Sequence, residues 1–64
     1  MSKLEITKIA SDFAYGSDKI AEDAARDLAR LASGDLEIYK QLLQDQRPDV
    51  RWWAVRSLAE IKIP

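Results

Sequence analysis

The side chains of this chain that could do chemistry are crowded into one short acidic and basic segment. Glu22, Asp23 and Asp27 alternate there with Arg26 and Arg30. Paired carboxylates can act as general acid and base, or they can hold a cation. Here arginines are interleaved, and Glu22 and Arg26 have the i,i+4 spacing of a helix-stabilising ion pair. We therefore interpret the segment as a solvated helix face rather than a catalytic or metal site.

A second group of residues could bind nucleic acid. Arg47, Arg51 and Arg56 accompany two aromatic residues, Trp52 and Tyr39. Such a cluster can neutralise phosphates and stack the bases of a single strand. Aspartates at positions 45 and 49 flank these arginines, and the formal net charge of the chain is −1. The charge balance argues against nucleic acid as a partner, although a weak nucleic-acid-binding helical module stays an alternative.

The composition excludes several other kinds of site. The 64 residues include no cysteine and no histidine. Disulfides, thiol nucleophiles, Cys/His zinc sites and imidazole-based triads are therefore excluded, and we predict a non-enzyme without cofactor or metal. No apolar run approaches the ~20 residues of a membrane span, and the N-terminus lacks a signal-peptide pattern. We predict a cytoplasmic protein without a membrane partner.

The spacing of apolar residues predicts four short helices and no strand. The expected helices cover about residues 3–14, 18–33, 35–45 and 48–62. Short turns between helices favour antiparallel neighbours. The predicted fold is all-α, with a single domain over residues 1–64. It comprises two helical hairpins, at about 3–33 and 35–62, as in an α-solenoid fragment or a small helical bundle.

Residues at the expected helix ends support this division. Gly16 should end the first helix in the left-handed conformation that glycine adopts easily. Ser17 or Asp18 should cap the second helix, and Asp35 the third. Pro48 suits the first turn of the fourth helix, where its missing N–H has no partner in any case.

Each expected helix also has an apolar face that should be buried. The predicted core faces comprise Ile6, Ile9, Ala10 and Phe13; Ile20, Ala24, Leu28 and Leu31; Leu36, Tyr39, Leu42 and Leu43; and Val50, Ala54, Ser57, Leu58 and Ile61.

The second and fourth expected helices repeat each other at an interval of thirty residues. Placing Ile20 on Val50 aligns Ala24 with Ala54, Arg26 with Arg56, Leu28 with Leu58, Ala29 with Ala59, and Leu31 with Ile61. Self-similarity at a fixed period is typical of stacked supersecondary units.

The fourth expected helix resembles the second helix of a HEAT-like repeat, of the short phycobilisome-lyase type. The resemblance is carried by Pro-Asp-Val-Arg at positions 48–51, followed by Ala54, Leu58 and Ile61. It implies stacked helical hairpins whose surface binds other proteins, with Val50, Ala54, Leu58 and Ile61 in the core and Arg51 at a charged ladder position. Arg47 stands where the family often has an aspartate cap, and Ala21 where the first copy should carry an arginine. Because some HEAT-like proteins are lyases or DNA glycosylases, a subunit or fragment of such an enzyme stays an alternative.

The fourth expected helix is apolar on two faces. On a helical wheel, Trp52, Val55 and Ala59 lie opposite the predicted core face, whereas Trp53 borders the core. We predict that these three residues, with Arg51 and Arg56, form a protein interface, because tryptophan is the residue most enriched at interface hot spots. Missing repeats, a like copy in a homodimer or other homo-oligomer, or a distinct protein would cover it. The predicted function is a non-catalytic protein–protein interaction scaffold.

Overall fold

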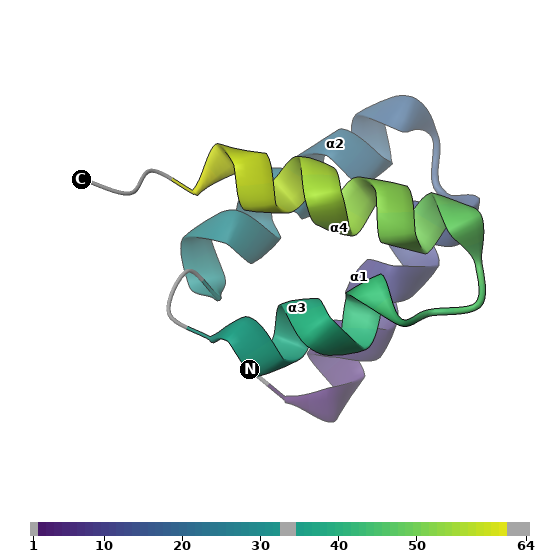
Figure 1. Cartoon of the computed structure of the whole chain (residues 1–64). Helices are drawn as coiled ribbons and strands as arrows, with labels where there is room; N and C mark the ends of the chain where they lie inside the picture. Colours follow the sequence, from purple (N-terminus) through teal and green to yellow (C-terminus); the bar gives the residue numbers. More distant parts are fainter. Residues whose placement is uncertain (1, 33–34, 62–64) are drawn as a thin grey trace.

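The chain folds into four helices, shown in Figure 1 as a computed structural model that describes residues 2–32 and 35–61. The helices are α1 (Lys3–Tyr15), α2 (Asp18–Leu31), α3 (Leu36–Leu43) and α4 (Pro48–Glu60). The described residues contain no strand, so the predicted all-α fold with four helices is confirmed. The predicted ends of the second and fourth helices, at positions 33 and 62, lie outside the described residues.

The helices form two layers. In Figure 1 the hairpin of α3 and α4 lies in front of α1 and α2, and α3 and α4 run in opposite directions. α4 packs against all three other helices, and α1 also packs against α2. The second and fourth helices begin at Asp18 and Pro48, which is the same interval as the sequence repeat. The helix that carries the predicted interface is thus also the helix that joins the two layers.

The predicted helix starts are confirmed. The Ser17 hydroxyl accepts a hydrogen bond from the backbone N–H of Ile20 at 3.3 Å. The Asp35 carboxylate accepts one from the N–H of Glu37 at 3.2 Å, and Pro48 is the first residue of α4. These contacts satisfy N–H groups that have no partner within the helix.

α1 begins with a capping box that was not predicted. The Ser2 hydroxyl accepts from the N–H of Glu5, and the Glu5 carboxylate accepts from the N–H of Ser2, both at 3.2 Å. These contacts with Ser2 lower the pKa of Glu5. The serine-x-x-glutamate spacing was a sufficient signal for this motif.

Gly16 follows α1 as predicted, but the predicted left-handed conformation is wrong. Its φ of −74° and ψ of 162° are extended. A Cβ atom at this position would lie 2.6 Å from the backbone oxygen of Asp12 and 2.8 Å from Cγ2 of Ile20. Gly16 is required by the close approach of α1 and α2 rather than by backbone conformation.

The core is built from alanines and Leu28 on α2 and from mostly larger residues on its neighbours. The buried hydrophobic residues are Ile9, Ala10, Phe13, Ala21, Ala24, Ala25, Leu28, Ala29, Ala32, Ile38, Tyr39, Leu42, Val50 and Ala54. Alanine keeps the side-chain volume between helices small, so a neighbouring helix can approach closely.

Three residues of the predicted core faces lie at the surface instead. Ile20 is 49% exposed, Leu31 60% and Leu36 63%. On α2 the buried arc is centred on the alanines, which turns Ile20 and Leu31 outward. On α3 the core takes Ile38, which the predicted face omitted.

Leu58 and Ile61 are only partly buried, although they pack against the core. Trp53 is also partly buried, and its ring stacks on Phe13 with centroids 6.3 Å apart. The position predicted for Trp53, at the border of the core, is confirmed.

Candidate functional site

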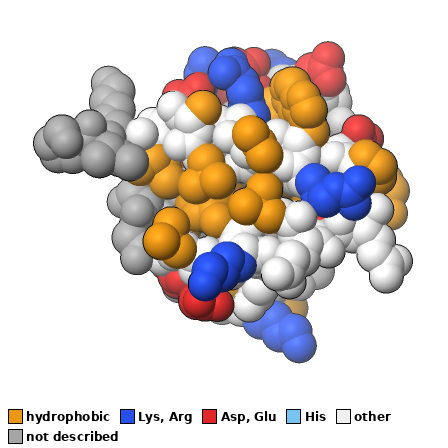
Figure 2. Space-filling view, in the orientation of Figure 1, with side chains coloured by type: hydrophobic (Ala, Val, Ile, Leu, Met, Phe, Trp, Pro, Cys, Tyr) orange, Lys and Arg blue, Asp and Glu red, His pale blue; other side chains and the backbone are white. Residues whose placement is uncertain are grey.

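The predicted interface residues lie together on one exposed side of α4. We call Arg51, Trp52, Val55, Arg56 and Ala59 the outer face of α4; all five are exposed. Trp52 is 59% exposed and Val55 57%. Figure 2 shows hydrophobic side chains gathered over α3 and α4 on the face toward the viewer, with lysine and arginine side chains around this hydrophobic group. A grouped apolar surface of this kind is typical of protein-binding sites.

The opposite side of α4 positions this outer face. Val50, Ala54 and Ser57 are fully buried against the other helices. Successive residues of a helix turn by about 100°, so burial of these three residues directs Val55 and Ala59 toward solvent.

Trp52 is held by an aromatic contact. Its ring meets the edge of the Trp53 ring at a centroid distance of 4.7 Å and an interplanar angle of 86°. Because Trp53 in turn stacks on Phe13, the exposed indole is connected to the core. An aromatic side chain that is already ordered loses less conformational entropy on binding than a free one.

A buried hydroxyl fixes α4 against α2 and α3. The Ser57 hydroxyl donates to the backbone oxygen of Ala25 at 2.7 Å and lies 2.9 Å from the Tyr39 hydroxyl. Burial raises the pKa of Tyr39, and the hydrogen bond with Ser57 opposes that rise. Ser57 was placed on the core face from the sequence, but its two partners come from distant segments and had no sequence signal.

An arginine–aspartate pair shapes the loop before α4. Asp45 accepts from Nε and Nη2 of Arg47 at 2.9 and 3.0 Å, and from the Arg47 backbone N–H at 2.9 Å. The hydrogen bonds from Arg47 lower the pKa of Asp45 to about 2. The Arg47 guanidinium lies 5.8 Å from the Tyr15 ring centroid, so the loop is also attached to the end of α1. Arg47 precedes α4 without a side-chain cap, and this pair orders the loop instead.

The proposed basic and aromatic cluster for nucleic acid is not assembled. Tyr39 is buried at 1% exposure, so its ring cannot stack on a base. Arg51 donates to the backbone oxygen of Asp45 at 2.7 Å, and Arg47 is paired with the Asp45 carboxylate. Arg56 lies 3.9 Å from Glu60. The arginines therefore already have partners within the chain.

The acidic and basic segment of α2 forms surface ion pairs. Glu22 and Arg26 are paired at 3.0 Å, as the spacing predicted. Asp27 is paired with Arg30 at 3.2 Å. Exposed pairs of this type contribute little to stability. Among the residues that the structure describes, no three acidic side chains are grouped as a metal site would require.

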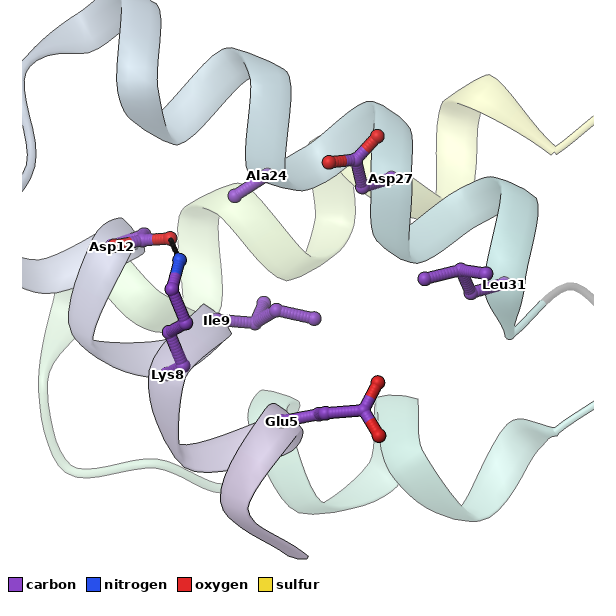
Figure 3. A pocket seen from close by; sticks show the side chains of 7 residues that line it. All are labelled: Glu5, Lys8, Ile9, Asp12, Ala24, Asp27 and Leu31. Atoms are coloured by element: carbon purple, nitrogen blue, oxygen red, sulfur yellow. Dashed lines mark hydrogen bonds and ion pairs between the residues drawn. The ribbon is translucent and has the colours of Figure 1, made fainter. Parts of the chain in front are cut away.

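A groove between α1 and α2 was not foreseen. Its volume is about 170 Å³, and it is lined by Glu5, Lys8, Ile9, Asp12, Ala24, Asp27 and Leu31. We call it the α1/α2 groove. In Figure 3, Ile9 and Leu31 point toward one another across it, Lys8 is bonded to Asp12, and α4 passes behind. The groove forms because one side of α2 is not covered by another helix. The helical pattern of the sequence does not determine which side that is.

No family model, curated protein or solved structure matches this chain. None of the described helices combines the length and the hydropathy that crossing a membrane requires.

Proposed function

We propose that this chain is a non-catalytic protein-interaction module of HEAT-like repeat type. It binds through the outer face of α4, which packs against the surface of another protein chain. The observation that carries the proposal is the exposure of Trp52 and Val55 on a helix whose opposite side is fully buried. Covering such residues removes apolar surface from water, at about 25 cal/mol per Å².

The HEAT-like assignment is supported by the arrangement of hairpins. The two hairpins lie in successive layers, and α2 and α4 begin at the interval of the sequence repeat. In stacked repeats the terminal units need a polar outer surface to stay in water alone. The outer face of α4 is apolar at its centre, which is the character of an internal surface.

Light scattering coupled to size exclusion tests the proposal. The mass of the parent chain should rise with concentration, and Val55→Glu should remain monomeric because its carboxylate would be desolvated in the contact. Ser11→Glu is the matched control, because Ser11 is exposed on α1, on the side of that helix away from the buried Ile9. A parent chain that stays monomeric at high concentration, with Trp52 fully accessible to a quencher, would contradict the proposal.

A further inference from the structure

The contact between α2 and α4 shows which surfaces of the two repeats fit together. The Ser57 hydroxyl on α4 donates to the backbone oxygen of Ala25 on α2. Ala25 and Ala29 are buried, and α2 and α4 are packed together. Within the chain, α2 thus presents the side that carries Ala25, and α4 presents the side that carries Ser57.

The outer face of α4 corresponds to the side of α2 that this contact already uses. We call two residues repeat equivalents when they are thirty positions apart. The repeat equivalents of Ala25 and Ala29 are Val55 and Ala59, both exposed on the outer face of α4. The last helix therefore shows to solvent the surface that the second helix buries against a neighbour.

The complementary surface is partly exposed on α2. The buried side of α4 carries Val50, Ser57 and the partly buried Ile61. Their repeat equivalents on α2 are, in order, Ile20, Asp27 and Leu31. All three are exposed, and two of them line the α1/α2 groove. One chain thus carries both halves of the contact on different helices, and on α2 the equivalents of Ala54 and Leu58, Ala24 and Leu28, are already buried within the chain.

We propose that copies of this chain associate head to tail, with the outer face of α4 in one copy packed on the α1/α2 groove of the next. The proposal rests on the proposed function, since it uses the same face of α4, and it names a second copy as the partner. A contact between two different surfaces is heterologous, so it propagates into a ring or an open filament rather than stopping at a two-fold dimer.

The charges on the two surfaces favour this pairing. The α1/α2 groove is lined by three carboxylates and a single ammonium, which belongs to Lys8. Arg51 supplies a cation on the outer face of α4, one helical turn before Val55. In the contact inside the chain, the repeat equivalents of Arg51 and Asp27 are the neutral residues Ala21 and Ser57. Compared with the contact inside the chain, the outer face of α4 gains a positive charge and the α1/α2 groove gains a negative one. These opposite charges favour contact between the two surfaces.

Two single variants and their mixture test the arrangement. Val55→Glu blocks the outer face of α4, and Leu31→Lys blocks the α1/α2 groove by placing a charged side chain on its apolar lining. Both residues are more than half exposed, glutamate favours helices more than valine does, and lysine favours them about as much as leucine, so both variants should fold. Melting followed by circular dichroism checks this, and analytical ultracentrifugation measures mass.

We expect each variant to be monomeric at concentrations where the parent chain associates. The equimolar mixture should form a one-to-one dimer, because each variant retains the surface that the other has lost. If Leu31→Lys associates as the parent does while Val55→Glu does not, head-to-tail association is wrong and the proposed function stands. If Val55→Glu still associates, or if the parent is monomeric throughout, both are overturned.

Discussion

α2 and α4 carry the same repeated pattern but have different surroundings. α2 buries Ala25 and Ala29 against neighbouring helices, whereas their repeat equivalents on α4, Val55 and Ala59, are exposed. Conversely, Val50 of α4 is fully buried, and its repeat equivalent Ile20 is half exposed. Each of these two helices therefore has two apolar sides, and the fold of one chain covers only one of them. An apolar pattern therefore identifies surfaces that pack, without saying whether the partner is in the same chain.

The largest loss of stability is expected from Leu28→Ala, which is compared with Leu58→Ala because Leu28 and Leu58 are repeat equivalents. Leu28 is fully buried, so the cavity should lower the free energy of unfolding by ~2–5 kcal/mol. Leu58 is partly buried and should cost less. Urea denaturation of the two variants at low protein concentration measures both losses. Equal losses would mean that the two helices are equally enclosed.

Ser57 and Asp27 form a second pair of repeat equivalents with unequal expected effects. Ser57→Ala leaves the Ala25 carbonyl and the Tyr39 hydroxyl without their buried partner, which should cost ~1–3 kcal/mol. Asp27→Ala removes only an exposed ion pair with Arg30 and should change stability by less than ~0.5 kcal/mol.

Combining Ser57→Ala with Tyr39→Phe controls this result. The double variant should lose less stability than the sum of the two single losses, because both substitutions disrupt one hydrogen bond. Additive losses would show that the two hydroxyls act independently.

The loops before α2 and α4 should respond differently to acid. Ser17, which caps α2, does not titrate in acid, whereas Asp45 before α4 has its pKa lowered from 3.8 to about 2 by hydrogen bonds from Arg47. The folded pKa lies below the unfolded value, so this stabilisation is present above about pH 4 and is lost as the pH falls toward 2. Thermal melts of the parent and of Asp45→Asn should converge over that range. A constant difference between them from pH 6 to pH 2 would contradict the role of Asp45.

The smallest expected effect is on nucleic acid. Arg47 and Arg51 are both bonded to Asp45, so binding to single-stranded DNA should be weaker than ~10⁻⁴ M at physiological salt. Fluorescence anisotropy with a labelled oligonucleotide measures it. Micromolar affinity that falls steeply with added salt would make the outer face of α4 a phosphate-binding surface.

Much of the fold could be predicted because it depends on local signals. Ser17, Asp35 and Pro48 mark helix starts through hydrogen bonds or dihedral angles within a few residues of each. The exposure of Trp52 and Val55 followed from helix periodicity once Val50 and Ala54 were assigned to the core.

What could not be predicted depends on how helices pack. Ile20 and Leu31 are as hydrophobic as core residues, yet the neighbours of α2 pack on its alanine side, where small side chains let helices approach closely. This packing leaves the α1/α2 groove open. It also brings Ile20 close to Gly16, which is needed for space rather than for a left-handed turn. Both outcomes depend on contacts between helices, which no local pattern encodes.

Thiol labelling of Val55→Cys shows whether another protein chain covers the outer face of α4. The chain has no cysteine of its own, so the label reports a single position. A trace of this variant is mixed with increasing amounts of the parent chain, and Ser11→Cys serves as the exposed control. We expect labelling of Val55→Cys to slow as the parent chain is added, while labelling of Ser11→Cys does not. Equal and constant rates at both positions would contradict it.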